Sequence, residues 1–246
     1  MTATDRPVML ITGGSRGIGA AIAGAAASSY HLVLNYTASH DAADSVAEVV
    51  RSAGADVMVH QADVSDEPSV LAMFAAIDDR FGRLDVLVNN AGIAGGYGGL
   101  DTVTASMLER LWAVNVTGAF ICSREAARRM AGRGGSIITI SSKAAVLGGS
   151  GEWVHYAASK GALDTMTIGL SKELAASGIR VNAVRPGLIE SDFHLAATPG
   201  RVERMLPSVP MLRSGAPSEV AAAVMWLASA EASYVTGAFI DVTGGR

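Results

Sequence analysis

Cysteine is almost absent from this sequence, in which Cys122 is the only one among 246 residues. A single cysteine cannot form an internal disulfide, and no cysteine and histidine residues have the spacing of a zinc site. We therefore expect neither a disulfide framework nor a metal centre. A chain of this length buries roughly 70–75% of the surface that its unfolded form exposes, so that it needs no such cross-link.

Charged residues are also few, at 17% of the chain, and the net charge is only −4. Nothing in this balance argues for nucleic acid as a partner. Residues 1–7 contain Asp5 and Arg6 but no apolar core, which argues against a signal peptide. Residues 17–39 carry no charge and raise the question of a membrane span, but they are mostly Ala, Gly and Ser and divide into a helix and a strand. We expect a soluble cytoplasmic protein without a membrane segment.

Short apolar runs alternate with helical patterns along the whole chain, which predicts βαβ units and a parallel sheet. We expect an α/β fold of the Rossmann type, a doubly wound sheet of about seven parallel strands with helices on both faces. The length suits one domain, residues 1–246. The expected strands lie within 8–11, 32–34, 56–60, 84–88, 136–140, 179–184 and 238–242. The expected helices run to about 29 and over about 41–51, 69–81, 104–129, 154–177 and 217–230.

A glycine-rich loop follows the first apolar run, with the spacing Gly13-x-x-x-Gly17-x-Gly19. A strand, a glycine turn and a helix in succession offer backbone N–H groups and a helix N-terminus to a phosphate. In this arrangement Gly13 permits the tight turn, Gly17 permits close approach of a pyrophosphate, and Gly19 permits close packing of the helix. The alternative is a glycine-rich turn that binds nothing.

No acidic residue follows the second strand, where residues 35–39 read Asn-Tyr-Thr-Ala-Ser. Enzymes that bind NAD usually carry an Asp or Glu there to hold the ribose 2′-hydroxyl. Arg16, in the glycine loop, can instead face a 2′-phosphate, so the pattern favours NADP over NAD. The alternatives are a solvated Arg16 and simple helix capping by Thr37 and Ser39.

Polar residues follow the third and fourth strands as well, namely Asp63 and, in the run Asn89-Asn90-Ala91-Gly92, Asn90. In a parallel sheet the ligand lies beyond the carboxyl ends of the strands, so these residues converge with Gly17 on one edge. Asp63 can bind an adenine ring or only shape the next turn.

Asn115 is a polar residue in the apolar run 113–118, where a buried amide needs a partner. It is either a satisfied core residue or an amide that kinks the helix and positions a water. Ser141 and Ser142 follow the fifth strand and bring hydroxyl groups to the same sheet edge.

Tyr156 and Lys160 are four residues apart in a predicted helix and therefore lie on one face. A phenol has a pKa of about 10, and a neighbouring ammonium favours its anion. The pair suits general acid–base work on a hydroxyl or carbonyl. On its own it can equally be an exposed lysine one turn from a half-buried tyrosine.

Residues 188–215 contain three prolines and show poor periodicity, which is typical of a long loop and plausible for a substrate lid. Several side chains here and elsewhere can line the pocket or merely pack within loops. They are Tyr97, Glu152, Trp153, His155, Phe193, His194, Met205 and Met211.

Together these motifs resemble those of the short-chain dehydrogenase/reductase family, in the family's order and over the whole chain. The resemblance rests on Thr12-Gly13-x-x-x-Gly17-x-Gly19, Asp63-Val64, Asn89-Asn90-Ala91-Gly92, Asn115, Ser142, Tyr156-x-x-x-Lys160 and Pro186-Gly187. It implies that Ser142 polarises a carbonyl oxygen, that Tyr156 exchanges a proton with it, and that Lys160 binds the nicotinamide ribose and lowers the tyrosine pKa. Asn115 would hold a water of the proton relay.

The resemblance also implies a set of cofactor contacts, in which Asn90 supports the cofactor and Ile189 and Ser191 meet the carboxamide. The full set is Gly13, Ser15, Arg16, Gly17, Ile18, Gly19, Asn35, Tyr36, Thr37, Asp63, Val64, Asn90, Ala91, Gly92, Tyr156, Lys160, Pro186, Gly187, Ile189 and Ser191. The family often has Thr where this chain has Ser191, and the hydroxyl is kept. The gap from Ser142 to Tyr156 is one residue longer than in many members, which leaves Ser141 as an alternative to Ser142.

The resemblance predicts an NADP-dependent oxidoreductase that interconverts a carbonyl and a secondary alcohol, with NAD possible. Arg16 and the missing acid look like the NADP-preferring members, including 3-oxoacyl carrier-protein reductases, whereas residues 154–160 are similar to sugar 1-dehydrogenases. Trp153 occupies the position where enoyl reductases of the family carry their tyrosine, which argues against double-bond reduction. A catalytically silent NADP-sensing protein is an alternative, and an epimerase or dehydratase would generally be longer. The resemblance further implies a homotetramer, formed in part through the helices of Asn115 and Tyr156.

Overall fold

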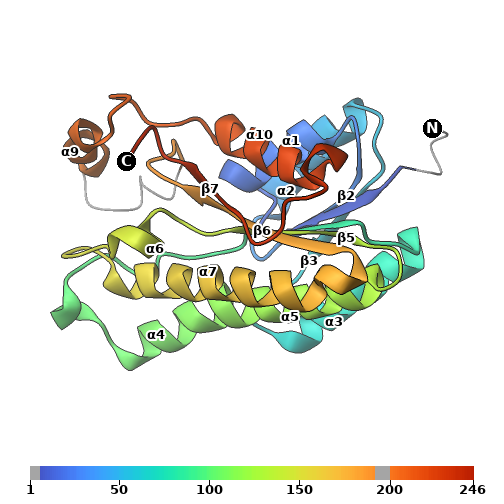
Figure 1. Cartoon of the computed structure of the whole chain (residues 1–246), viewed down its shortest axis with the longest axis horizontal. Helices are drawn as coiled ribbons and strands as arrows, with labels where there is room; N and C mark the ends of the chain where they lie inside the picture. The colour runs from blue at the N-terminus through green and yellow to red at the C-terminus, as the bar shows by residue number, and fades with distance from the viewer. Residues whose placement is uncertain (1–5, 192–199) are drawn as a thin grey trace.

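Seven parallel strands form the centre of a computed structural model, which describes residues 6–191 and 200–246 (Figure 1). Within these residues the strands form one sheet in the order β3-β2-β1-β4-β5-β6-β7. Their bounds are β1 Val8–Ile11, β2 His31–Tyr36, β3 Val57–Gln61, β4 Val86–Asn89, β5 Gly135–Ile140, β6 Ile179–Pro186 and β7 Phe239–Val242. The predicted Rossmann-type sheet is therefore confirmed.

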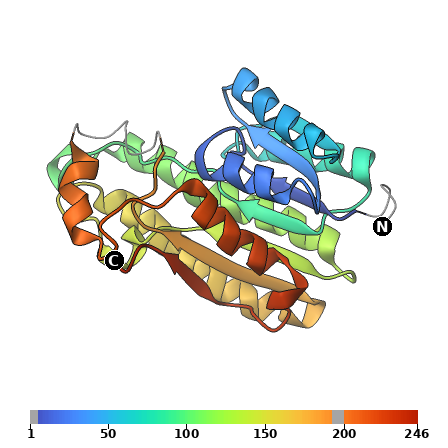
Figure 2. The same ribbon diagram turned by 90° about the horizontal axis from the view of Figure 1, so that it is seen from above.

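Helices cover both faces of the sheet in two layers. Figure 1 shows α1, α2 and α10 over one face and α3, α5 and α7 over the other, and Figure 2 shows α1 lying beside α10. The α-helices are α1 Gly17–Ala26, α2 His40–Ser52, α3 Glu67–Phe81, α4 Ala105–Trp112, α5 Gly118–Met130, α6 Ala144–Leu147, α7 Val154–Leu174, α9 Arg201–Met205 and α10 Pro217–Ala228. Short 3-10 turns are η2 Leu100–Thr102, η4 Ala175–Ser177, η5 Leu206–Ser208 and η6 Ala230–Ala232.

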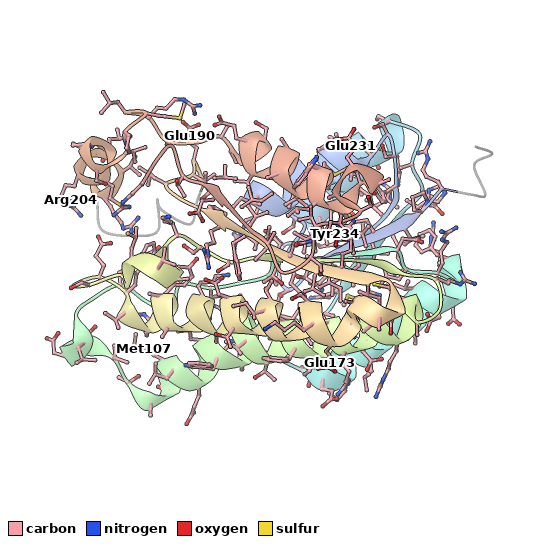
Figure 3. The ribbon with its side chains drawn as sticks, viewed as in Figure 1. Met107, Glu173, Glu190, Arg204, Glu231 and Tyr234 are labelled. Atoms are coloured by element: carbon pink, nitrogen blue, oxygen red, sulfur yellow. The ribbon has the colours of Figure 1, made fainter. Side chains whose placement is uncertain are left out.

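The two faces of the sheet contribute side chains to two separate cores. Along β1, Met9 and Ile11 pack with α1 and α10, whereas Val8 and Leu10 pack with α3 and α5. All four side chains are buried, because a parallel sheet between two helical layers has no solvent-facing side. The charged side chains of Glu173 and Glu231 lie on the outside of the molecule, as Figure 3 shows.

Local sequence fixes the ends of α3. The Asp66 carboxylate accepts a hydrogen bond from the Ser69 N–H at 3.0 Å, and Pro68 occupies the first turn. Gly82 ends the helix with φ of +64°, a left-handed conformation that glycine adopts without strain. The helix consequently begins two residues before the predicted start at Ser69.

The predicted continuous helix over residues 104–129 is wrong in one respect, because it contains a π-helical turn. This turn, η3 (Ala113–Thr117), separates α4 from α5 and contains Asn115. A π-turn inside a helix often marks a functional position. Among the described residues, no helix is long and apolar enough to cross a membrane.

Two substitutions in α3 test the assignment of the core. Ile77 is fully buried, whereas Leu71 on the same helix is 42% exposed. We expect Ile77→Ala to lower the free energy of unfolding by about 2–5 kcal/mol, because it leaves a cavity. Leu71→Ala should cost less than about 1 kcal/mol. Equal losses in urea titrations would contradict this packing.

Candidate active site

A cleft of about 1100 Å³ runs along the carboxyl ends of the strands. Residues 36–39, at the end of β2, line one end of the cleft, and the glycine loop lines its middle. Ser142, Trp153 and Tyr156 line the other end. The topology explains this position, because β1 pairs with β2 on one side and with β4 on the other. Chains that leave β1 and β4 in opposite directions open a crevice at their carboxyl ends.

The glycine loop has the backbone expected of a phosphate cradle. Gly13 and Gly17 have φ of +63° and +53°, which favours glycine. A Cβ on Gly19 would collide with the Gly13 carbonyl oxygen, so α1 can begin this close to the turn only with glycine there. A Cβ on Gly17 would meet only Ser191, at 3.9 Å, so that this backbone faces open space in the cleft. The loop therefore fits a pyrophosphate at the N-terminus of α1.

Two asparagines hold the glycine loop in place. The Asn90 amide donates to the carbonyl oxygens of Thr12 and Gly13, both at 2.9 Å. The Asn35 side chain accepts from the Gly13 N–H at 3.2 Å and donates to the Ala62 carbonyl oxygen at 2.9 Å. Asn35 is buried and does not line the cleft, in contrast to the predicted cofactor contact. Its side chain supports the loop, because both of its ends are used within the fold.

The end of β2 presents hydroxyl groups and no carboxylate to the cleft. Tyr36 lies there with its hydroxyl 2.7 Å from Nδ1 of His40, and Thr37 and Ser39 are exposed. Ser39 precedes α2 but makes no capping hydrogen bond with its side chain, so the capping alternative finds no support. Arg16 is exposed on the cleft wall and forms no ion pair within the described residues. The geometry leaves its guanidinium available to an anion.

Asp63 is held by two neighbours at the wall of the cleft. The Ser65 N–H and hydroxyl donate to Oδ1 at 2.9 and 2.6 Å, and Arg110 on α4 donates to Oδ2 at 2.9 Å. Burial alone would raise the pKa of this carboxyl, but the hydrogen bonds from Ser65 and Arg110 outweigh it, and the pKa is lowered. Asp63 thus shapes the turn, as one alternative predicted. Arg110 also lines the cleft, although no sequence motif predicted it.

Ser142 and Tyr156 meet at the far end of the cleft, where their hydroxyls are hydrogen-bonded. Tyr156 lies in the first turn of α7 and is buried. Burial raises the pKa of its phenol, and the Ser142 hydroxyl opposes that shift only in part. The neighbouring Ser141 differs, because its hydroxyl donates to Asp164 at 2.6 Å. This contrast favours Ser142 over Ser141 as the serine of the site.

Lys160 lies one helical turn from Tyr156, with Nζ 5.7 Å from the centre of the phenol ring. The ammonium donates to the Ile140 carbonyl oxygen at 2.8 Å. Burial lowers the pKa of Lys160 to about 8, and the charge of Asp164 opposes that shift. The expectation that Lys160 lowers the pKa of Tyr156 finds no support here, because burial raises that pKa and the groups that oppose the shift are Ser142 and Arg201.

Asn115 connects the π-turn to the loop after β4. Its side chain accepts from the Ile93 N–H at 2.8 Å and donates to the Ile93 carbonyl oxygen at 2.9 Å and to Ser159 on α7 at 3.0 Å. Asn115 is therefore a satisfied buried amide and also a break in the helix. That Asn115 also holds a water of the proton relay stays a prediction.

A cation surrounded by aromatic rings lies beside Tyr156. Arg201, at the start of α9, is 2% exposed and lies 4.0 Å above the Trp153 ring, which is itself 4.9 Å from the Tyr156 ring. Its guanidinium also pairs with Glu152 at 2.9 Å. No sequence motif predicted Arg201, because an arginine in an irregular segment carries no local sign of its partner.

The other predicted site residues lie in different places. Most cofactor candidates line the cleft, namely Ser15, Ile18, Val64, Ala91, Gly92, Pro186, Gly187, Ile189 and Ser191, as do Tyr97 and Met205. His155 is buried with Nε2 3.2 Å from the Gly96 carbonyl oxygen. Phe193 and His194, and with them part of the expected lid over 188–215, lie outside the described residues.

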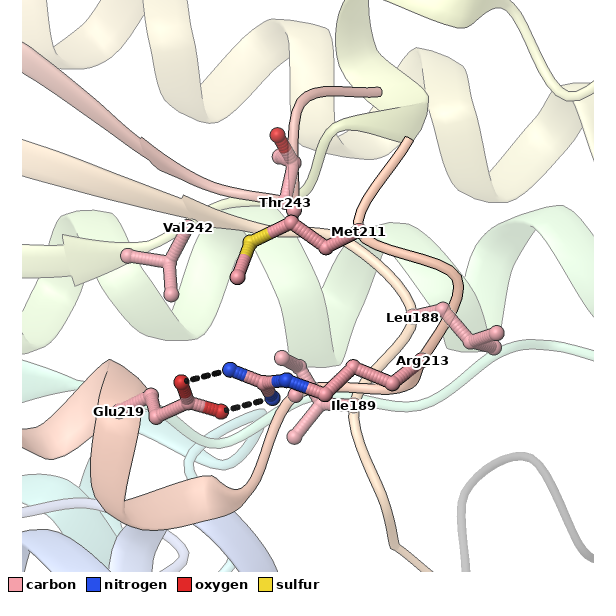
Figure 4. Close-up of a pocket in the computed structure, with 9 residues that line it drawn as sticks. Leu188, Ile189, Met211, Arg213, Glu219, Val242 and Thr243 are labelled. Atoms are coloured by element: carbon pink, nitrogen blue, oxygen red, sulfur yellow. Dashed lines mark hydrogen bonds and ion pairs between the residues drawn. The ribbon is translucent and has the colours of Figure 1, made fainter. Parts of the chain in front are cut away.

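Met211 lines a different and much smaller hollow of about 40 Å³ (Figure 4). There Arg213 forms two hydrogen bonds with Glu219 on α10, at 2.7 and 2.8 Å. Glu219 also accepts from the Ala216 N–H, and these contacts lower the pKa of its carboxyl to about 2. The contacts fasten the segment before α10 to the first turn of that helix, and the hollow is too small for a substrate.

Fold and cleft together define an α/β protein with a Rossmann-type parallel sheet and a cleft at the carboxyl ends of its strands, and comparison with known proteins identifies its family. A family model described as enoyl-(acyl carrier protein) reductase matches residues 13–246. An uncharacterized oxidoreductase of Escherichia coli K12 is 50% identical, over 97% of this chain and 99% of its own length. A 3-oxoacyl-[acyl-carrier-protein] reductase of Staphylococcus aureus is 39% identical over 96% of each chain.

Solved structures of short-chain dehydrogenases/reductases are also similar to this chain. A double variant of a Serratia marcescens short-chain dehydrogenase/reductase superposes with a TM-score of 0.92 at 38% identity, covering 97% of both chains. A short-chain type dehydrogenase/reductase from Mycobacterium marinum also gives 0.92, at 33% identity, over 97% of this chain and 94% of its own. The chain belongs to the short-chain dehydrogenase/reductase family and is an oxidoreductase of that family.

The contacts of Asn115 generate a prediction on stability. Asn115→Ala removes the side-chain partner of the partly buried N–H and carbonyl groups of Ile93. We expect the free energy of unfolding to fall by about 2–4 kcal/mol. Thr117→Ala, an exposed position in the same π-turn, should change it by less than about 0.5 kcal/mol. A comparable small change in both variants, measured by urea titration, would refute the proposed role of the amide.

Proposed function

We propose that this protein is an NADP-dependent oxidoreductase that interconverts a carbonyl and a secondary alcohol by hydride transfer, with Tyr156 as general acid and base. One observation carries the proposal. The hydrogen-bonded hydroxyls of Ser142 and Tyr156, with the buried Lys160 beside them, lie at one end of a cleft that begins at a glycine-rich phosphate cradle. NAD stays possible as a second cofactor.

Membership of the family implies a nicotinamide cofactor, and the residues of the cleft fit one. The cradle at Gly13 and Gly17 would hold the pyrophosphate, and the wall near Asp63 the adenine. Arg16 would pair with the 2′-phosphate, because the end of β2 offers hydroxyls and no competing carboxylate. The bound nicotinamide would supply the hydride in reduction and accept it in oxidation.

The chain's own residues would manage the proton. Ser142 and Tyr156 would donate hydrogen bonds to the carbonyl oxygen and stabilise the negative charge that develops on it. Burial favours the protonated phenol, so Tyr156 holds a proton to donate at neutral pH. The Lys160 ammonium would stabilise the tyrosinate left behind, because it lies 5.7 Å from the ring. A relay through a water at Asn115 completes the proposal.

Reduction of a carbonyl is preferred to reduction of a carbon–carbon double bond. The matching family model is described as an enoyl reductase, but its relatives here include 3-oxoacyl carrier-protein reductases. Tyr156 precedes Lys160 by four residues, and its hydroxyl is bonded to Ser142, which is the pairing expected to bind a carbonyl oxygen. Trp153 occupies the position at which the family's enoyl reductases carry tyrosine. A sensor without catalysis has no use for this pairing and is not favoured. A sugar 1-dehydrogenase is not favoured either, because the relatives named above are an uncharacterized oxidoreductase and a 3-oxoacyl carrier-protein reductase.

We also propose a homotetramer, formed in part through α4, α5 and α7. Large apolar side chains are exposed on these helices, namely Trp112 at 40%, Phe120 at 47% and Ile168 at 43%. Their burial against a second copy would remove apolar surface from water.

Replacement of Tyr156 by Phe tests the proposed proton transfer. The variant keeps the ring and loses only the hydroxyl, so turnover should fall by at least about 100-fold while NADPH binding survives. The assay follows NADPH and NADH oxidation with ketones, 3-oxoacyl thioesters and sugar lactones. Near-wild-type turnover by Tyr156→Phe would overturn the proposal.

Arg16→Ala tests the choice between NADP and NAD. Loss of a charged hydrogen-bond donor should weaken NADPH binding by about 10- to 100-fold and leave NADH binding nearly unchanged. Arg133→Ala removes an exposed arginine that does not line the cleft and serves as the control. Equal losses for both cofactors in a fluorescence titration would count against a 2′-phosphate contact.

A further inference from the structure

Asp164 is a buried carboxylate that the mechanism above leaves without a role. It lies on α7 and is 7% exposed. Its Oδ1 accepts from the Ser141 hydroxyl at 2.6 Å, and its Oδ2 accepts from Arg185 Nε and Nη2 at 3.0 and 2.8 Å. Both oxygens are thus bonded, which a buried carboxylate requires to stay ionised.

These contacts join three elements directly behind the proposed proton-transfer site. Ser141 is the first residue after β5 and directly precedes Ser142, and its hydroxyl also lies 3.3 Å from the Lys160 carbonyl oxygen. Arg185 belongs to β6, and its guanidinium lies 4.0 Å above the Phe239 ring of β7. The carboxylate of Asp164 therefore fixes the distance between the strand end that carries Ser142 and the helix that carries Tyr156 and Lys160.

Asp164 also places a negative charge near Lys160. The two residues are four apart on α7 and so lie on one face of the helix. Burial favours the neutral amine of Lys160, and Asp164 acts in the opposite direction. Other groups around Lys160 and this network are the Tyr156 phenol on the same helix, Arg185 from β6, Asp241 from β7, Lys143 after β5 and Arg201 from α9 near the phenol.

On the basis of the proposed function, we propose that Asp164 is a positioning residue of the proton-transfer site, which aligns Ser142 through Ser141 and keeps Lys160 in its charged form. The residue acts on the reaction through its neighbours, because its own oxygens are occupied by Ser141 and Arg185. Family resemblance gave no indication of it, and it does not line the cleft.

The lysine content of the chain permits a direct test, because it has only Lys143, Lys160 and Lys172. Protein labelled with ¹³C at the lysine ε carbon would give three NMR signals, assigned with Lys143→Arg and Lys172→Arg. The titration midpoint of Lys160 should lie near 8 in the wild type. In Asp164→Asn it should fall by about one pH unit, since a stabilising charge is lost. An unchanged Lys160 midpoint would overturn the proposal.

Asp241→Asn provides a matched control. Asp241 is bonded to Lys143 at 2.6 Å and lies 3.9 Å from Arg185, without a bond to Ser141. We expect this variant to leave the Lys160 midpoint within about 0.3 pH unit of the wild type, well below the shift expected from loss of a directly adjacent charge. An equal shift of Lys160 in both variants would attribute the effect to net charge alone and contradict the proposal.

A second pair of variants covers the case in which Asp164→Asn does not fold. Asp164→Asn with Arg185→Gln removes both charges of this ion pair and is compared with Arg185→Gln alone. The Lys160 midpoint should be lower in the double variant, and equal midpoints would refute the proposal. The titration needs neither cofactor nor turnover, so an inactive protein with a shifted midpoint would reject only the proposed function. In an active protein the alkaline limb of the pH–rate profile should move to lower pH with the midpoint.

Discussion

The parallel pairing of β1 with both β2 and β4 is the constraint on which the site depends. Because every strand of the sheet points the same way, all carboxyl ends meet at one edge. The glycine loop after β1, Asn90 after β4 and Ser142 after β5 are far apart in sequence but line one cleft for this reason. Asn35 and Asn90 then hold the loop from two sides, so the cradle is formed by the fold itself.

Burial sets the chemistry at the far end of this cleft. It acts on Tyr156 and Lys160 in the same sense, favouring the neutral phenol and the neutral amine. The polar groups nearby oppose that tendency, Ser142 at the phenol and Asp164 at the amine. A phenol that keeps its proton next to an ammonium that keeps its charge is a suitable donor to a carbonyl oxygen. The contacts of Asp164 with Ser141 and Arg185 therefore belong to the proposed mechanism.

The sequence predicted what depends on short-range pattern. Apolar runs located all seven strands, and the spacing of Gly13, Gly17 and Gly19 located the cradle, because each signal lies within a few consecutive residues. It did not predict which polar side chains are used within the fold. Asn35 was expected at the cofactor, yet it bonds to the glycine loop and to Ala62, and the pairing of Arg201 with Glu152 joins residues 49 apart. Such contacts depend on how distant elements meet, which no local pattern records.

The transfer of hydride from NADPH to a carbonyl carbon is the step of the proposed function that can be tested most directly. NADPH with deuterium at both C4 positions of the nicotinamide would be incubated with the protein and the panel of ketones, 3-oxoacyl thioesters and sugar lactones, and the products examined by mass spectrometry. We expect one deuterium on the carbinol carbon of the alcohol formed by the wild type, and at least about 100-fold less of this alcohol from Tyr156→Phe. Saturable NADPH binding with no deuterated alcohol from any carbonyl would contradict the assignment of this cleft to hydride transfer.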